Sequence, residues 1–484
     1  MPSDWSWSTL ALVAVLLMQA ALVLRVFLKR GREPSARITW AVIIVVAPIV
    51  GIAGYILFGE INIGRRRVER LRRVLASLPD PAQALEGAGP DAAPRVPERR
   101  EHIFRAAATV NGYPPVGGNR ARLSTDSDES IDALVADIDA ARDHVHLCFY
   151  IWLTDRNGTR VAQAAMRAAR RGVACRVLVD DIGSRGLIGS PLWEEMAAAG
   201  VRLARALPVG WVLLRPLRGR IDLRNHRKLA VIDDRIAWCG SQNCADAAFL
   251  PKARFGPWVD VMMRIEGPLA RQHQHLFASD WMAHAPDDMA ALLDRPPPPC
   301  GPGFTGQVVA GGPVSRVTPM PEIFTTLMFS ARRSLVITTP YYIPDEPLQA
   351  ALIACAHRGV ETILTVPAVN DSWFVRVASR STYEALLAAG VRIFEYHGGL
   401  LHAKAMSVDE DIALIGSANL DRRSLALNFE NNVLLHDPEV TRDLRARQEA
   451  WIARSTEVLA SDVAAWSWRI RLRNNVVALA GPIL

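Results

Sequence analysis

Cysteine is scarce and scattered in this chain of 484 residues. The sequence contains six cysteines, with no CxxC pair and no compact Cys/His cluster. This spacing argues against a disulfide framework or a zinc site and is typical of buried thiols. Low-complexity segments are also lacking from the bulk of the chain, and half of the residues are apolar. We therefore expect a packed protein with at least two globular units, because one core rarely serves so many residues.

Net positive charge is lacking from most of the chain, although the whole sequence carries +7. Residues 1–74 contain eleven Lys and Arg against four Asp and Glu, which leaves 45 of each kind in the remainder. A body without net basic charge argues against nucleic acid as a partner. The excess basic residues instead surround the apolar N-terminal segments, where anionic lipid headgroups would lie.

Two apolar runs without charged residues lie near the N-terminus, at 5–24 and 38–59. At about 1.5 Å per residue, each run is long enough to cross a hydrocarbon core of about 30 Å as a helix. A cleaved signal peptide is the alternative for the first run, but that run is long, lacks a small-x-small cleavage site and precedes a second run. We therefore predict a transmembrane hairpin over residues 1–73, with spans at about 5–27 and 38–59.

A hairpin puts the N-terminus and the body on one side of the membrane. Six basic residues then flank that side and four lie in the loop between the runs, which favours a cytoplasmic body. Residues 74–117 are rich in Ala, Pro and Gly, so we expect a linker or irregular lead-in there, with a short helix around 101–110.

The rest of the chain reads as a duplicated unit. The stretches ARDHVHLCFYIW, AARRGVACRVLVDD and AAAGVRLAR match ARRSLVITTPYY, ACAHRGVETILTVP and LAAGVRIFE. These stretches combine helix ends or glycine turns with apolar strands. We predict an α/β fold of two pseudo-symmetric domains, each a sheet flanked by helices, over 118–298 and 299–484. The first half has an extra insertion at 208–220. Its Trp and Leu residues either face acyl chains or the membrane, or belong to an ordinary packed loop.

Each half carries the same motif, HxK(x4)D(x6)GSxN. The first copy consists of His226, Lys228, Asp233, Ser241 and Asn243, and the second of His402, Lys404, Asp409, Ser417 and Asn419. Residues i and i+2 of a strand point to one face, so each His and Lys can contact the same phosphate. The Asp should lie near the far end of the strand or in the next turn, and the small residues of GSxN should let a phosphate approach. Together the two copies predict one pseudo-symmetric site.

The repeated motif resembles the signature of the phospholipase D superfamily. Neighbouring segments narrow the resemblance to bacterial cardiolipin synthases: LRNHRKLAVID with GSQN, TPYYIPDE, ASRSTYEALLAAGVRI, LHAKAMSVD and SANLDRRSLALNFENN. The N-terminal pattern of Trp40, Pro48, Gly51, Tyr55 and Phe58-Gly59 is also similar. The resemblance covers nearly the whole chain. It implies a multi-pass protein of the bacterial inner membrane.

The resemblance implies transfer of a phosphatidyl group from one phosphatidylglycerol to the glycerol hydroxyl of another, which gives cardiolipin and glycerol. It assigns His226 as the nucleophile that forms a phosphatidyl–histidine and His402 as the general acid and base. The sequence alone leaves the order of the two histidines open. Neither a metal nor another cofactor is expected, because the two lysines supply positive charge.

The remaining motif residues receive supporting roles. Side chains expected to hold the phosphate oxygens, with the serines assisting, are Lys228, Lys404, Asn243, Asn419, Ser241 and Ser417. The two motif aspartates, Asp233 and Asp409, are expected to orient or polarise. Glu430 is expected to support one histidine from across the dyad, as carboxylates do elsewhere in the superfamily.

Several alternatives remain open. A phospholipase D-type hydrolase, with water as acceptor, shares the intermediate, and so does a phosphatidyltransferase that uses another donor or acceptor, such as phosphatidylethanolamine as donor. A nuclease is disfavoured by the apolar runs and the neutral body, and a catalytically inactive scaffold by the two intact motifs. The stretch 466–473, with aromatic and basic residues side by side, suits an interfacial segment or a packed terminal element. The oligomeric state is left open.

Overall fold

The structure is a computed structural model, and the residues that it describes are 7–29, 34–60, 64–208, 220, 222–313 and 319–479. The Trp and Leu residues of the 208–220 insertion lie outside the described residues, so neither expectation for that insertion is addressed.

One continuous mixed sheet of 15 strands runs through the body. From the middle outward, the first half contributes β1 (Val116–Leu123), β8 (Met262–Glu266), β6 (Ile236–Gly240), β5 (Lys228–Ile232), β2 (His144–Phe149), β3 (Ala174–Asp180) and β4 (Arg202–Ala206). The second half repeats this order with β9 (Phe304–Gly311), β18 (Glu430–His436), β16 (Ile412–Gly416), β15 (Ala405–Val408), β10 (Ser334–Thr338), β12 (Glu361–Pro367) and β13 (Arg392–Tyr396), and adds β19 (Ser455–Val458) at the edge. The antiparallel pair β1–β9 joins the halves. The predicted α/β fold with two pseudo-symmetric units is confirmed.

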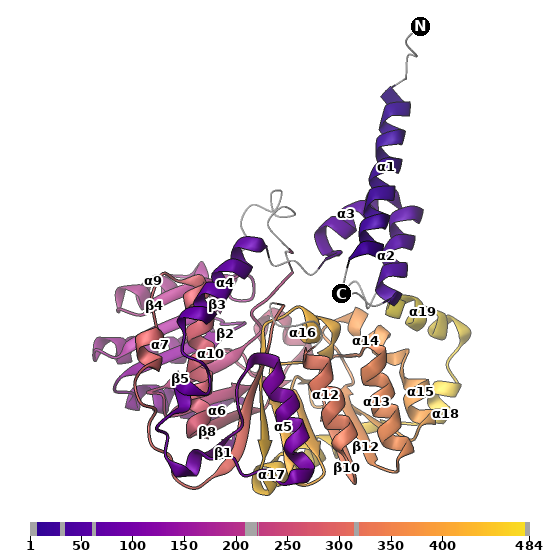
Figure 1. The fold of residues 1–484 in the computed structure, drawn as a ribbon. Coiled ribbons are helices and arrows are strands. Elements are labelled where there is room, and N and C mark those ends of the chain that lie inside the picture. The colour runs from indigo at the N-terminus through magenta and orange to yellow at the C-terminus, as the bar shows by residue number, and fades with distance from the viewer. Residues whose placement is uncertain are drawn as a thin grey trace.

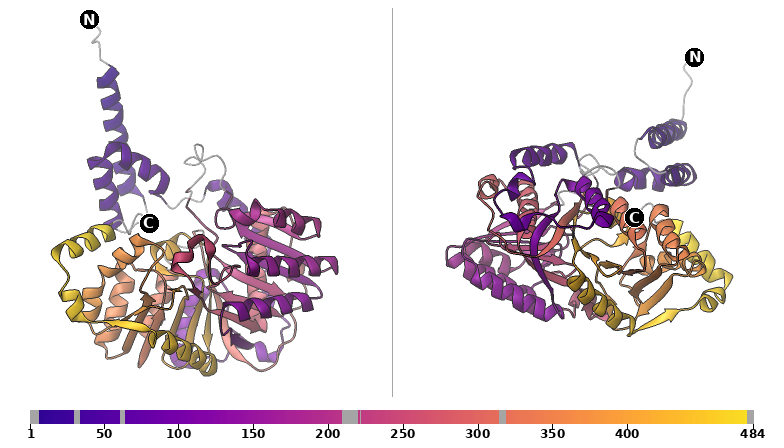
Figure 2. Two further views of the ribbon diagram at one scale, coloured as in Figure 1. Left: turned by 180° about the vertical axis from the view of Figure 1, so that it is seen from behind. Right: turned by 60° about the horizontal axis from the view of Figure 1, so that its bottom comes forward.

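Helices cover both faces of this sheet (Figures 1 and 2). In the first half these are α6 (Ser127–Ala140), α7 (Arg156–Arg170), α8 (Arg185–Ile188), α9 (Pro191–Ala198), α10 (Pro268–His284) and α11 (Ala290–Leu293). In the second half they are α12 (Pro319–Ser330), α13 (Glu346–His357), α14 (Trp373–Arg380), α15 (Tyr383–Ala388), α16 (Arg422–Ala426), α17 (Pro438–Ile452), α18 (Ala460–Ala464) and α19 (Trp468–Leu479). Aspartate side chains accept backbone N–H groups at the starts of α6, α7, α13 and α17, which fixes where these helices begin.

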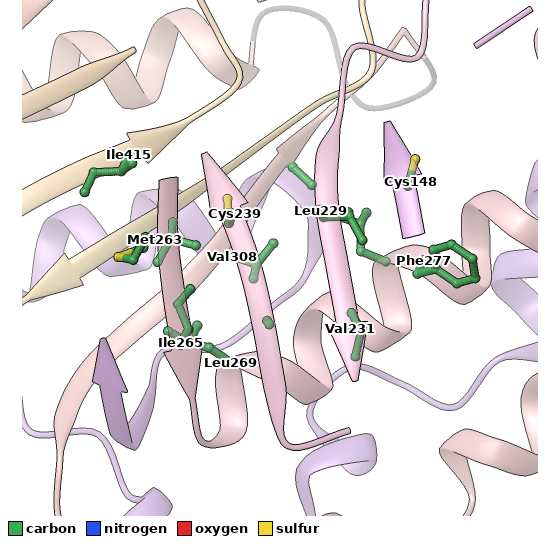
Figure 3. Close-up of a cluster of buried hydrophobic side chains, with 14 of the residues drawn as sticks. Cys148, Leu229, Val231, Cys239, Met263, Ile265, Leu269, Phe277, Val308 and Ile415 are labelled. Carbon is green, nitrogen blue, oxygen red and sulfur yellow. The ribbon is translucent and has the colours of Figure 1, made fainter. Parts of the chain in front are cut away.

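The largest apolar core lies between the sheet and α10 and draws on both halves. In Figure 3, Leu229 and Val231 of β5 and Phe277 of α10 belong to the first half, whereas Val308 of β9 and Ile415 of β16 belong to the second. Full burial of a side chain of this size contributes about 1.5–3 kcal/mol. Because one core spans the seam, the two halves pack as a single body. Five of the six cysteines are buried and all six are free, as the scattered spacing predicted.

The segment predicted as a linker is instead packed on the body. It contains the end of α4 (Arg65–Ser77), the short helices Gln83–Leu85 and Pro90–Ala92, and α5 (Glu98–Asn111). Ile103 and Phe104 of α5 are buried in the core of the second half. Arg100, also buried, pairs with Asp409 and Asp411 at 2.6 Å each. The short helix expected around 101–110 is thus present as α5, whereas the Ala- and Pro-rich composition did not indicate these anchors.

The second apolar run does not form one long helix. It divides into α2 (Pro34–Val46) and α3 (Pro48–Phe58), whereas α1 (Trp7–Leu28) is the one described helix that is long and apolar enough to cross a membrane. Pro48 lacks the N–H that would bond to the carbonyl of Ile44, and its ring disfavours a continuous helix. At about 1.5 Å per residue, α2 and α3 are about 20 and 17 Å long, short of a 30 Å core. The second expected span, 38–59, is therefore divided at Pro48, and a second crossing of the membrane stays a prediction.

Helices α2 and α3 pack against each other and against the lower half of α1 (Figure 1). A Cβ atom on Gly51 would lie 2.4 Å from the carbonyl oxygen of Ile43, so glycine is needed where the two helices meet. Gln19 of α1 donates from Nε2 to the carbonyl oxygen of Ile44, at 2.7 Å. That carbonyl is the one whose helical partner Pro48 removes.

The end of α3 returns to the end of α1. Glu60, just beyond α3, accepts from Nε of Arg25 at 2.5 Å and lies 3.2 Å from Nζ of Lys29.

For the C-terminal stretch 466–473 we expected either an interfacial segment or a packed terminal element, and its tryptophans differ in this respect. Trp466 packs beside Tyr383, with ring centroids 6.3 Å apart, whereas Trp468 at the start of α19 is exposed.

Candidate active site

Each motif histidine is held in place by the opposite half of the molecule. The backbone N–H of His226, just before β5, donates to the carbonyl oxygen of Phe429 at 2.9 Å. The backbone N–H of His402 donates to the carbonyl oxygen of Val259 at 2.7 Å, beside the short parallel pair β14 (Leu400–Leu401) and β7 (Trp258–Val259). The residue that follows each of these carbonyls is a carboxylate. The backbone therefore brings each histidine next to an acidic side chain from the other half.

The two carboxylates bind the two imidazoles. Nδ1 of His226 lies 2.9 Å from Oε2 of Glu430, and Nδ1 of His402 lies 2.7 Å from Oδ1 of Asp260. A carboxylate can only accept, so each Nδ1 is assigned the proton and each Nε2 keeps a lone pair. The structure thus places Glu430 opposite His226, and it supplies Asp260 as the equivalent partner of His402.

Asp260 was missed by the sequence analysis because the spacing of the two copies differs after GSxN. Glu430 follows Ser417 by 13 residues, whereas Asp260 follows Ser241 by 19. The first half carries extra residues there, including the short helix Leu250–Phe255. Matching the strands after the motifs, VDVMMRI with FENNVLL, would have found the pair.

The glycine and serine of the GSxN motifs support the site from behind. Oγ of Ser241 donates to Asp260 at 2.6 Å, and Oγ of Ser417 donates to Glu430 at 2.5 Å. A Cβ atom on Gly240 would lie 2.2 Å from the carbonyl oxygen of Val261, just before the neighbouring strand. Strand packing therefore requires glycine at this position, and the approach of a phosphate beside these small residues stays a prediction.

Both motif lysines are buried behind the histidines. Nζ of Lys228 donates to the carbonyl oxygen of His226 at 2.7 Å and lies 5.2 Å from the ring centroid of Tyr150. Nζ of Lys404 donates to the carbonyl oxygen of His402 at 2.5 Å. Burial lowers the pKa of Lys228 to about 8 and the pKa of Lys404 well below its usual value. An anionic phosphate between the two lysines would raise both pKa values and so favour the charged forms.

Burial favours the neutral form of both motif histidines. Burial lowers the pKa of His226 and of His402 to about 4, although the facing carboxylates raise it in part. Burial raises the pKa of Asp260, but His402 and Lys404 outweigh it and hold that pKa at about 2. The pKa of Glu430 is likewise below its usual value, because His226 and Lys228 outweigh burial. Neutral imidazoles beside ionised carboxylates provide a nucleophilic Nε2 and a partner able to stabilise its positive charge.

Both histidines open onto one cavity of about 520 Å³. The side chains of Asn243 and Asn419 also line it, so the structure brings these expected phosphate ligands to the cavity. Oδ1 of Asn419 is buried and has no hydrogen-bond partner among the described residues. Within that same part of the chain, no cluster of three or more His, Cys, Asp or Glu could hold a metal ion.

The motif aspartates lie away from the cavity. Asp233 accepts the backbone N–H groups of residues 142–144 at 2.8–2.9 Å, and Asp409 accepts those of residues 332–334 at 2.8–3.2 Å. Both residues have positive φ, 51° and 53°, in the turn after the motif strand. They tie that turn to the start of the neighbouring strand. Their contacts support an anchoring role, and the expectation that they orient or polarise stays a prediction.

Comparisons with known proteins agree with this geometry. The family model described as "Cardiolipin synthase, PLD-like domain" matches residues 134–281 and 324–451, and the model "Phospholipase_D-nuclease N-terminal" matches residues 17–60. Cardiolipin synthase A of Edwardsiella ictaluri (strain 93-146) is 39% identical over 459 residues, which is 93% of each chain. Cardiolipin synthase A of Proteus mirabilis (strain HI4320) is 36% identical over 488 residues, 99% of this chain and 98% of the relative.

A solved structure supports the fold. Phosphatidylserine synthase of Haemophilus influenzae Rd KW20 matches with a TM-score of 0.57 and 14% sequence identity, over 80% of this chain and 100% of that chain. The crossed histidine–carboxylate pairs, the repeated sheet order and these full-length relatives point to one conclusion. This chain belongs to the cardiolipin synthase family of phospholipase D-like proteins.

Proposed function

We propose that this chain synthesises cardiolipin by transferring a phosphatidyl group between two phosphatidylglycerol molecules, with glycerol as the second product. The observation that carries this proposal is the pair of crossed histidine–carboxylate contacts, His226–Glu430 and His402–Asp260, that open onto one cavity. Relatives of nearly full length that are named cardiolipin synthase A support the choice of substrate.

In the first step, Nε2 of His226 attacks the phosphorus of a phosphatidylglycerol. A phosphorus–nitrogen bond forms and the bond to the glycerol oxygen breaks, while Nε2–H of His402 gives that oxygen its proton. The bound phosphate anion raises the pKa of His402 above its value in the empty site, so that the imidazole carries the proton it must give. Glu430 stabilises the positive charge that His226 gains.

In the second step, a glycerol hydroxyl of another phosphatidylglycerol attacks the phosphatidyl–histidine. His402 takes the hydroxyl proton, the new phosphorus–oxygen bond forms, and the phosphorus–nitrogen bond breaks to return neutral His226. The products are cardiolipin and the enzyme in its starting form. Lys228 and Lys404 hold the phosphate oxygens as charge develops, with Asn243 and Asn419 beside them.

The test uses the purified full chain in vesicles of phosphatidylglycerol with a labelled headgroup glycerol, read by mass spectrometry. We expect one labelled glycerol released for each cardiolipin formed. Phosphatidic acid in place of cardiolipin would establish a hydrolase and reject the proposal. Vesicles of phosphatidylethanolamine with phosphatidylglycerol test the alternative donor, since only that donor releases ethanolamine.

For the membrane segment, we propose a single crossing by α1, with α2 and α3 as a re-entrant pair that enters and leaves on the side of the body. The pairing of Glu60 with Arg25 and Lys29 supports this arrangement, because a full second span would end near the start of α1. The Gln19 contact with Ile44 supports a turn about halfway along α1. This arrangement replaces the two-span hairpin expected from the sequence.

The re-entrant arrangement also sharpens the orientation. All eleven Lys and Arg residues of positions 1–74 then lie at or beyond the body-side end of α1, and residues 1–24 contain none. The positive-inside rule therefore predicts a cytoplasmic body, at the inner membrane of a bacterial cell, and an N-terminus on the outer side. A Ser3→Cys variant should react with a membrane-impermeant maleimide in intact cells, and Ser77→Cys only after permeabilisation. Equal protection of both would support two spans; the unsubstituted chain is the blank.

A further inference from the structure

The two halves place the same motif residues at the site, but the charged residues around the two motif copies differ. Arg224 stands two positions before His226, whereas Leu400 stands at the equivalent position before His402. Arg423 stands four positions after Asn419, whereas Ala247 stands at the equivalent position after Asn243. Each arginine thus has an uncharged counterpart in the other half. The two arginines therefore break the two-fold symmetry of the site.

The two arginines come from different halves and converge on one flank of the cavity. Both line the cavity beside His226. Arg423 also contacts Asp222, which lies two residues before Arg224, so the two arginines lie on the same side of the cavity. The ring of Tyr150 lies 4.8 Å from the ring of His226. Positive charge is therefore gathered on the His226 flank.

Acidic groups hold Arg423 at the wall of the cavity. Nη1 of Arg423 lies 3.1 Å from Oδ2 of Asp222, and Nη2 donates to the backbone carbonyl of the same residue at 2.7 Å. Asp222 also pairs with Arg220, whose Nε lies 2.6 Å from Oδ1. Asp421 lines the cavity as well. One carboxylate is thus shared by two guanidinium groups, and the sharing fixes the position of Arg423.

The opposite flank is apolar or neutral. Trp258 packs on His402 with ring centroids 4.4 Å apart, and Phe249 stacks on Trp258 at 4.0 Å. Lys252, the cation of that flank, pairs with Asp371 at 2.5 Å, and the hydroxyl of Tyr341 donates to Asp371 at 2.6 Å. The His402 flank therefore offers little net charge to a second anion.

The proposed reaction also differs between its two alcohols, the one that leaves and the one that enters. The phosphate under attack lies between the two histidines, and the alcohol that leaves is neutral glycerol. The alcohol that enters belongs to a lipid with its own phosphodiester, separated from the attacking hydroxyl by a three-carbon glycerol. A site for lipid-to-lipid transfer must therefore hold one further anion, whereas transfer to water needs no such subsite.

We propose that Arg224 and Arg423 form the subsite for the phosphodiester of the acceptor lipid, and so select a phosphatidylglycerol acceptor over water and neutral alcohols. The proposal rests on the proposed function. A guanidinium offers a planar pair of N–H donors that suits a phosphodiester. When the acceptor is held there, its free hydroxyl loses a proton to the histidine base, its oxygen bonds to the phosphorus, and the phosphorus–nitrogen bond breaks.

The experiment measures how one intermediate is partitioned between acceptors. The full chain is given phosphatidylglycerol vesicles with ethanol as a neutral competing acceptor, and cardiolipin, phosphatidylethanol and phosphatidic acid are measured together. Arg224→Gln and Arg423→Gln should each lower cardiolipin formation about 10- to 100-fold, as expected for the loss of a hydrogen bond to a charged group. Phosphatidylethanol and phosphatidic acid should fall less than about threefold.

Matched variants separate recognition from folding. Arg185→Gln, on a helix outside the cavity, should leave all three products unchanged. Arg224→Lys keeps the charge but not the fork, so it should restore part of the cardiolipin. Arg224→Gln leaves the contacts between Arg423 and Asp222 in place, so this variant tests the subsite if Arg423→Gln fails to fold.

An equal fall in all three products, or unchanged cardiolipin in both Gln variants, would overturn the subsite. A wild-type chain that forms phosphatidylethanol but no cardiolipin would instead reject the proposed function.

Discussion

The first and second halves of the body place the same parts at matching positions of one sheet, yet they differ in what surrounds those parts. His226 and His402 have the same backbone contact with the opposite half and the same kind of carboxylate partner. Around them, Arg224 of the first half corresponds to Leu400 of the second. The partner of His226 is Glu430, whereas the partner of His402 is Asp260. In the proposed reaction, the shared parts act on the phosphate and the differing parts on the acceptor lipid.

The largest effects should come from the histidines themselves. His226→Ala and His402→Ala should each lower cardiolipin synthesis about 10³- to 10⁴-fold, as expected when a nucleophile or a general acid is lost. The two variants should differ in what they accumulate. His402→Ala should retain a phosphatidyl group on His226, seen as an acid-labile mass increase on that peptide. Full activity of His226→Ala, or a label on His402, would contradict the assigned order.

The carboxylates should come next, at about 10²-fold in kcat/KM. Glu430→Gln should slow formation of the phosphatidyl–enzyme, because it removes the charge that stabilises His226 as it bonds to phosphorus. Asp260→Asn should change the pH profile. The Asp260 carboxylate favours protonated His402, so its loss lowers the pKa of His402, and the alkaline limb of kcat/KM should move to lower pH. An unmoved limb in Asp260→Asn would assign the proton transfer to another group.

The serines should show a smaller effect, of about tenfold or less. Ser417→Ala removes one hydrogen bond to Glu430, and Ser241→Ala removes one to Asp260. Each carboxylate keeps its histidine, so only its orientation is loosened. If a serine instead contacted the phosphate, the KM for phosphatidylglycerol would rise along with the loss in kcat, and that pattern would contradict the supporting role.

The motif aspartates should change stability and leave the activity of the folded enzyme nearly unchanged. Asp233→Ala leaves three backbone N–H groups without their acceptor, at a cost of about 1–3 kcal/mol. Asp409→Ala should cost more, because Asp409 also pairs with buried Arg100. Thermal unfolding in detergent, with specific activity on the soluble fraction, measures both. A loss of activity at unchanged stability would instead show that these residues take part in catalysis.

The parts of the site that could be predicted were those fixed by repetition. His226 and His402 were assigned to one site because two copies of a motif imply two matching faces, and Glu430 because of a family resemblance. Asp260 was missed, since residues inserted before it broke the register of the repeat. The contacts of Asp233 and Asp409 could not be predicted, because sequence spacing gives a position along a strand but not the backbone groups at its end. The division of the second apolar run at Pro48 was also not predicted, because composition indicated the length of the run and one imino acid interrupts the helix.

The β1–β9 seam turns what could be a pair of identical subunits into a single chain. In a dimer of identical subunits, every position occurs twice, so an arginine placed at one entrance of the site must appear at the other. Fusion removes that constraint while keeping the two halves at a fixed ratio, each supplying the carboxylate that the other's histidine needs. The residues around the site can then differ between the two halves, as Arg224 and Leu400 do. The two halves of one symmetric sheet can therefore take different roles in the reaction.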